Sequence, residues 1–154
     1  MKKFLICLLM ISSSVFAMDV NINGTYFSPA QGAVGTFEYE EAYLSIMKDG
    51  VITDFDIING ALLVDTTTYS IKGNVITHIS GENLTERTYD CNGEEVVVGP
   101  DEPMPSSIKA TVEKDSNGLT VTVSFGGQSE SLTVRNATAE EVSSTLALPR
   151  CTLK

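Results

Sequence analysis

Few side chains in this chain of 154 residues are of the types that catalysis or metal binding requires. One histidine, His78, and three cysteines exclude zinc sites of the His₃, Cys₄ and Cys₂His₂ kinds. The sequence also lacks a Walker A loop and the HExxH and GxSxG motifs. A catalytic triad would need His78 in a cleft beside a nucleophile and an acid, whereas the strand pattern puts it on a polar face. We therefore predict no enzymatic activity, no metal site and no cofactor.

Three aspartates, Asp54, Asp56 and Asp65, fall on adjacent predicted strands. Carboxylate oxygens of this kind are ligands for Ca²⁺. The segment 54–60 departs from an EF-hand loop, however, because its fifth position is Ile58 and its glycine comes one residue late. The pattern therefore indicates an acidic face in contact with water.

Turn-forming dipeptides divide the chain into short runs that are rich in β-branched and aromatic residues. Asp49-Gly50 and Asn59-Gly60 are the strongest of these signals, because type I′ hairpin turns need a positive φ at both central residues. Gly73-Asn74, Asn117-Gly118 and Gly126-Gly127 act in the same way. The runs between the turns predict strands near residues 24–28, 37–48, 51–58, 61–72, 75–80, 84–91, 107–114, 119–125 and 128–135.

This strand pattern predicts an all-β fold, a single up-and-down antiparallel β-barrel of about eight strands. A sandwich of two β-sheets is the alternative. Near the C-terminus, Thr138-Ala139-Glu140-Glu141 has the sequence of a capping box, which predicts a short helix to about Leu146. We expect the barrel domain to span residues 18–154.

Two-residue turns determine which residues of neighbouring strands lie opposite each other. They predict that Phe55 lies opposite both Leu44 and Val64. On the next pair of strands, they predict that Ser70 lies opposite Thr77. The face with these residues has no charge, so we expect it to point into the barrel, and we expect the face with the aspartates to meet water. Six apolar residues on the acidic face require either a cover or β-bulges: Met47, Ile52, Leu63, Tyr69, Ile71 and Ile76.

Hydroxyl groups occupy positions on the uncharged face where a solid core would hold aliphatic side chains. Two longer polar side chains also share the face of Phe125 near a hairpin end. We predict that these groups orient a small ligand inside the barrel, between apolar walls. The alternative is that the hydroxyl groups crowd one rim of the barrel. The predicted ligand-binding residues are Phe55, Val64, Thr66, Thr68, Ser70, Phe125, Gln128 and Glu130.

The first residues have the pattern of a secretory signal peptide. Lys2 and Lys3 form a positive start, an apolar run follows, and Val15-Phe16-Ala17 predicts cleavage after Ala17. Removal of residues 1–17 would leave eight basic residues against twenty acidic ones, a surface that repels nucleic acid. We predict a periplasmic or secreted protein with no membrane span in the mature chain.

The mature chain would keep two cysteines, Cys91 and Cys151. An even number of cysteines in an oxidising compartment predicts a disulfide, which here would close a loop of about 60 residues. The two residues are too far apart in sequence to form a CxxC redox motif, so we expect a structural bridge.

Residues 22–80 resemble bacterial lipocalin-like domains. The run from Thr68 to Ile76 is similar to the "tYsi.Gn.i" hairpin of these domains. Gly24-Thr25-Tyr26 is similar to their opening "GtW" or "GtY", and Leu44-Ser45-Ile46 before Asp49-Gly50 is similar to their "L.i..dG". The resemblance implies a non-catalytic protein that carries a small apolar or amphipathic ligand in its barrel.

The run from Tyr89 to Gly93, together with Cys151, resembles small periplasmic inhibitors of lysozyme. This second resemblance implies an alternative function, a protein-binding module such as a periplasmic enzyme inhibitor or an envelope-associated factor. A large inner cavity would favour the carrier of a small ligand. A filled barrel with an exposed apolar patch around Tyr69, Ile71 and Ile76 would favour the protein-binding module.

Overall fold

The computed structural model of the chain describes residues 18–28, 32–34, 37–39, 43–81, 84–100, 105 and 107–154, with the backbone alone at 32–34, 37–39 and 77–81. The predicted signal peptide and the side chain of His78 lie outside this described part.

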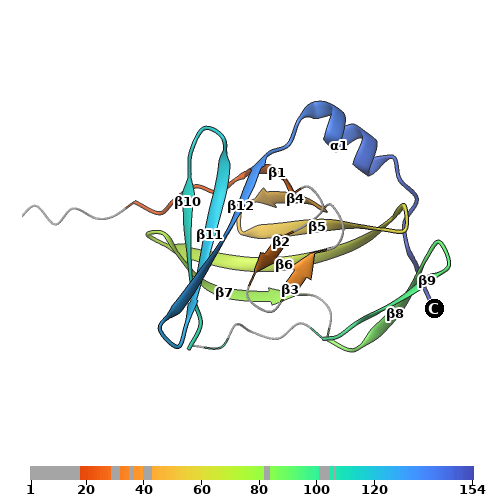
Figure 1. Cartoon of the computed structure of the whole chain (residues 1–154), viewed down its shortest axis with the longest axis horizontal. Coiled ribbons are helices and arrows are strands. Elements are labelled where there is room, and N and C mark those ends of the chain that lie inside the picture. Colours follow the sequence, from red (N-terminus) through yellow and green to blue (C-terminus); the bar gives the residue numbers. More distant parts are fainter. Residues whose placement is uncertain are drawn as a thin grey trace, which may run out of the picture.

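Eight strands form a closed antiparallel barrel (Figure 1). Around the barrel they follow the order β1-β12-β11-β10-β7-β6-β5-β4, so each barrel strand pairs with the next barrel strand along the chain, and β12 closes against β1. The predicted up-and-down barrel is therefore confirmed, and the alternative of a two-sheet sandwich is wrong. The barrel strands are β1 (Gly24–Ser28), β4 (Tyr43–Lys48), β5 (Val51–Ile58), β6 (Ala61–Lys72), β7 (Val75–Gly81), β10 (Lys109–Lys114), β11 (Gly118–Phe125) and β12 (Gln128–Asn136).

Outside the barrel, the described residues form two small sheets and one helix. One sheet pairs β2 (Gly32–Val34) with β3 (Phe37–Tyr39), so the strand predicted over 37–48 is divided between β3 and β4. The other sheet has the order β13-β8-β9, and β2, β9 and β13 are additional to the predicted strands. Its members are β8 (Arg87–Cys91), β9 (Glu94–Val98) and β13 (Thr152–Leu153).

The turns set the register of β4, β5 and β6 as the sequence predicts. Asn59 and Gly60 have φ values of 48° and 72°, which are the left-handed conformations that a type I′ turn requires. Phe55 accordingly lies opposite Leu44 on one side and Val64 on the other.

The predicted register between β6 and β7 is wrong beyond the first two residue pairs. Ile71 lies opposite Ile76, but the register then shifts between Ser70 and Ile71. Ser70 therefore lies opposite His78 rather than Thr77. A β-bulge of this kind adds one residue to one strand, and a turn dipeptide does not predict it.

Side chains from around the barrel meet in an inner core. Its buried members come from β1, β7, β10, β11 and β12 and from the segment before β1, and Met47, Tyr69 and Ile71 of β4 and β6 pack against them. Only the interior of a closed barrel can bring together side chains from strands on all its sides. The buried members are Ile22, Tyr26, Ile76, Ala110, Val112, Leu119 and Val134.

A second core lies on the outer surface of the barrel. Leu44, Phe55 and Leu62 form its buried centre, and Val142 of α1 (Ala139–Leu146) and Leu148 pack against them. Figure 1 shows α1 alongside β1, β4 and β5. The prediction that this uncharged face points into the barrel is therefore wrong, because the helix buries it from outside.

The helix begins at the predicted capping box. The backbone N–H of Glu141 donates to the Thr138 hydroxyl (3.2 Å), and the backbone N–H of Thr138 donates to the Glu141 carboxylate (2.9 Å). Arg135 pairs with Glu141, and its guanidinium lies 5.0 Å from the centre of the Phe27 ring. No helix in the described part of the chain is long and apolar enough to cross a membrane.

The segment before β1 lies across one end of the barrel, which we call the sealed end. The backbone N–H of Val20 donates to the carbonyl of Gly73 in the β6–β7 turn (2.7 Å). Asn23 exchanges two hydrogen bonds with Asp49 in the β4–β5 turn, and the Lys114 ammonium donates to the Asn23 carbonyl (2.6 Å). Contacts with three separate rim positions, and the burial of Ile22 in the inner core, close this end.

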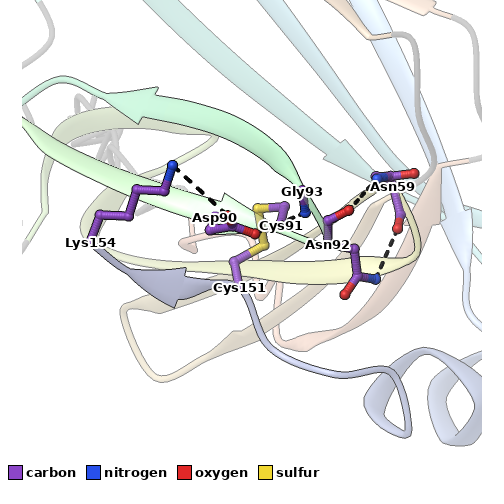
Figure 2. Close-up of a disulfide and its surroundings, with 7 residues drawn as sticks. All are labelled: Asn59, Asp90, Cys91, Asn92, Gly93, Cys151 and Lys154. Atoms are coloured by element: carbon purple, nitrogen blue, oxygen red, sulfur yellow. Dashed lines mark hydrogen bonds and ion pairs between the residues drawn. A yellow bond between two sulfur atoms is a disulfide. The ribbon is translucent and has the colours of Figure 1, made fainter.

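The β8–β9 hairpin packs against the barrel near the turn that joins β5 to β6. Cys91 and Cys151 form the predicted disulfide, with 4.4 Å between their Cα atoms (Figure 2). The side-chain amide of Asn59 donates to the carbonyl of Asn92 (2.8 Å), and that of Asn92 donates to the carbonyl of Asn59 (3.0 Å). Beneath these contacts, Ala61 and Leu63 pack against the hairpin in a third core with Cys91.

Candidate functional site: an acidic cavity in the barrel

A row of polar side chains crosses the inner wall at mid-height. Ser45 lies opposite Tyr26 and Asp54, and Asp54 lies opposite Asp65. Opposed residues of an antiparallel ladder point to the same side of the sheet. Because Tyr26 belongs to the inner core, Ser45 and the two aspartates also point inward.

The alternation of the β5 sequence explains why acids and an aromatic ring separate here. Asp54, Phe55 and Asp56 are consecutive, so a strand directs both carboxylates to one face and the ring to the other. The ring is buried under α1 beside Leu62, with the guanidinium of Arg150 5.3 Å from its centre. This outer packing fixes the strand with its carboxylates turned into the barrel.

The inward residues of β4, β5 and β6 line a cavity of about 540 Å³. Its volume lies within the range of small-molecule sites, about 300–1,000 Å³. Ile52 and Ser45 in its wall are almost fully buried, with 8% and 3% of their surface exposed. The complete lining is Tyr43, Ser45, Met47, Ile52, Asp54, Asp56 and Asp65.

Burial and neighbouring charge alter the ionisation of two carboxyl groups in this cavity, Asp54 and Asp56. Burial raises the pKa of Asp54 from 3.8 to about 6; the hydrogen bond from the Ser45 hydroxyl opposes that rise, and Asp56 and Asp65 add to it. Burial, and then the charge of Asp65, also raise the pKa of Asp56. The cavity is therefore an acidic environment in which Asp54 titrates close to neutral pH.

A second recess, of about 170 Å³, opens through the side of the barrel, and we call it the side window. β7 pairs with β6 only from Thr67 onward, so the described part of β7 does not extend along residues 61–66 of β6. The β8–β9 hairpin, which belongs to a different sheet, lies beside that part of β6. The window is lined by Asp56, Leu63, Val64, Asp65, Thr66, Arg87, Tyr89 and Val98.

The eight residues predicted to bind a ligand do not converge on one cavity. Phe55 is buried under the helix on the outer face, and Val64 and Thr66 line the side window. Thr68 and Ser70 are exposed. The face assignment from which these five residues were predicted is wrong, because the face lies outside the barrel.

The other three predicted residues lie at one end of the β11–β12 hairpin. Gln128 lies opposite Phe125, and Glu130 lies opposite Val123, as the Gly126-Gly127 turn predicts. Val123 packs against the inner core, but Phe125 is 60% exposed, and Gln128 and Glu130 are exposed too. These residues belong to the rim of the barrel, away from the acidic cavity.

The residues that do line the cavity were visible in the sequence on the face expected to meet water. Their burial could have been inferred from the apolar residues on the same face. Met47, Ile52 and Leu63 have the same strand periodicity as the aspartates. The structure resolves this conflict with a covered outer face and a mixed inner face. Within the described residues, no group of three His, Cys, Asp or Glu side chains has an arrangement that could hold a metal ion.

No family model, no curated protein and no solved structure matches the chain.

Proposed function

We propose that this protein is a non-catalytic binding protein of the periplasm or the extracellular space, and that its barrel holds a small amphipathic ligand with a cationic head. The observation that carries this proposal is the cavity of about 540 Å³ in a closed barrel, with three carboxylates in its wall. A barrel interior that serves only stability is filled by side chains, as the inner core at the sealed end is.

The chemistry of the wall defines the ligand class. Asp54, Asp56 and Asp65 supply negative charge, and Met47 and Ile52 supply apolar surface in the same cavity. Carboxylates taken out of water are costly unless a cation or hydrogen-bond donors compensate them. A ligand with an ammonium group and a short apolar body meets both requirements, whereas an anionic ligand would increase the repulsion.

The location rests on two features. Cys91 and Cys151 are joined, and disulfides persist in oxidising compartments. The sequence pattern of residues 1–17 is that of a secretory signal peptide.

The protein-binding alternative depended on an exposed apolar patch around Tyr69, Ile71 and Ile76. These side chains lie in or against the inner core, and Ile76 is only 7% exposed. The lipocalin-like resemblance remains a prediction, and it agrees with a ligand carried inside the barrel.

Titration calorimetry with n-octylamine tests the proposal, with n-octanol and n-octanoate as probes of the same chain length and different charge. We expect n-octylamine to bind with 1:1 stoichiometry at pH 7.5, and n-octanoate not to bind. Asp54→Asn should weaken n-octylamine binding by about tenfold, because one charge-assisted contact is lost. Glu113→Gln, which removes an exposed carboxylate on β10, is the matched control and should leave affinity unchanged. Equal affinity for the amine and the carboxylate would contradict the proposal.

A further inference from the structure

The side window and the inner cavity share part of their walls. Asp56 and Asp65 line both, so the window and the cavity meet at these two carboxylates. At the opposite end of the barrel, the segment before β1 contacts turns on several sides of the rim and closes it. A molecule that reaches the aspartates therefore has a route through the wall of the barrel.

The window exists because two different sheets meet there. Along residues 61–66 the described part of β6 has no ladder with β7, and the β8–β9 hairpin lies alongside without joining the barrel sheet. One consequence is seen at Thr66, whose backbone N–H donates to the side chain of Asp65 (2.8 Å) rather than to a neighbouring strand. The same edge of β6 is bonded to the C-terminal segment at Leu62. The Leu62 N–H donates to the carbonyl of Pro149 (2.8 Å), and the N–H of Cys151 donates to the carbonyl of Leu62 (2.8 Å).

The hairpin is held firmly, both along β8 and at its turn. Leu153 of β13 pairs with Tyr89, and the backbone N–H of Lys154 donates to the carbonyl of Thr88 (3.0 Å). The Cys91–Cys151 disulfide, the paired amides of Asn59 and Asn92, and the Lys154–Glu95 ion pair (2.6 Å) all lie at the part that contains the turn (Figure 2 shows the disulfide and the amides). Arg87 and Val98, which line the window, lie opposite each other at the other end of the hairpin. The hairpin is therefore a fixed wall of the window, and Tyr89 and Val98 in that wall also pack against the third core.

We propose that the side window is the entrance to the inner cavity, and that the β8–β9 hairpin forms one of its walls. This inference deepens the proposed function, because it assigns the access route of the same site. Arg87 lies at the mouth of the window with two carboxylates behind it. Its positive charge therefore disfavours the approach of cations to the window. Arg87 sets the rate at which a cationic ligand enters the cavity rather than the affinity of the cavity for that ligand.

The test uses covalent access to the cavity, so it does not depend on the identity of the ligand. In a Cys7→Ser background, Met47→Cys places a single free thiol on the cavity wall, since the other two cysteines are joined. The cationic reagent methanethiosulfonate ethylammonium is added, and mass spectrometry follows the rate of modification. Thr66→Trp and, separately, Arg87→Trp put bulk in the window of a chain that has no tryptophan. Gln128→Trp puts the same bulk at the rim of the barrel and is the matched control.

We expect both window variants to slow modification by about tenfold or more, and Gln128→Trp to leave the rate within about twofold. Arg87 is exposed, so its variant retains the fold even if Thr66→Trp does not, and thermal unfolding checks both. Arg87→Ala should speed modification. Equal rates in all variants, or slowing by Gln128→Trp alone, would overturn the proposal. Failure of n-octylamine to bind while the window variants still slow modification would refute the ligand class and leave the entrance in place.

Discussion

The two faces of the β4–β6 sheet are both largely buried, but they are built from different side chains. The outer face presents Leu44, Phe55 and Leu62 to α1 and forms a buried apolar core. The inner face presents Ser45 and the aspartates to a cavity. A covered outer face can supply stability on its own, and this leaves the inner face free to hold charged groups that weaken the fold.

The largest expected effect tests the outer face. Phe55→Ala should lower the free energy of unfolding by about 3–5 kcal/mol, because it removes buried surface and leaves a cavity under the helix. Val51→Ala is the control on the same strand and face, where the side chain is 37% exposed. Urea unfolding gives both values, and equal losses at the two positions would contradict the assignment of Phe55 to a core.

The neighbouring residue on the inner face should act in the opposite direction. The pKa of Asp54 is raised to about 6 in the folded protein, so between pH 4 and 6 the folded state binds more protons than the unfolded state. Stability should therefore fall as pH rises through this window, by about 3 kcal/mol in all for a rise from 3.8 to about 6.

Asp54→Asn removes this titration. At pH 7.5 the variant should be more stable than the wild type by up to about 3 kcal/mol, and near pH 4 the two should converge. Chemical unfolding at both pH values measures the difference. A variant that is less stable at pH 7.5 would show that the charge of Asp54 supports the fold, and it would remove the contrast between the two faces.

The sequence predicted the barrel and most of the register because both depend on local chemistry. Turns such as Asn59-Gly60 allow few conformations, and the pairing of Phe55 with Val64 follows from them. The same signal also exists at Asn92-Gly93, where φ is 53° and 90°, and it would have identified the β8–β9 hairpin.

The candidate site could not be predicted in the same way, because periodicity separates two faces without stating which one is inside. Leu44 and Phe55 have no charged neighbours on their face, and this property suits the interior of a barrel and the underside of a helix equally well. The answer depended on where Val142 and Leu148 pack, which is a contact between distant parts of the chain. Charged residues are usually expected to face water, and here they face the interior of the barrel. Sequence rules of this kind often fail at functional sites.

A smaller effect is expected at the helix that covers the outer face. Thr138→Ala removes the hydroxyl that caps α1 and should lower the free energy of unfolding by about 1 kcal/mol. Because α1 contacts the outer core and does not line the cavity, n-octylamine affinity should stay unchanged. A loss of affinity as large as that of Asp54→Asn would show that the two faces are coupled through β5.

The smallest effect concerns a single hydrogen bond on the inner face. The Ser45 hydroxyl donates to the Asp54 carboxylate, which favours the charged form and holds the pKa of Asp54 below the value that burial alone would give. Ser45→Ala should therefore raise this pKa above about 6, and the fall in stability with rising pH should extend to a higher pH. Carbon-detected NMR of the Asp54 carboxyl group measures the midpoint of its titration directly.

Ser131→Ala is the control for this prediction. The Ser131 hydroxyl pairs with Thr122 and contacts no carboxylate in the hydrogen bonds described, so the variant should leave the midpoint unchanged. An unchanged midpoint in Ser45→Ala would mean that solvent, rather than the Ser45 hydroxyl, compensates the charge of Asp54. The inner face would then hold more water than its side chains indicate, in contrast to the outer face.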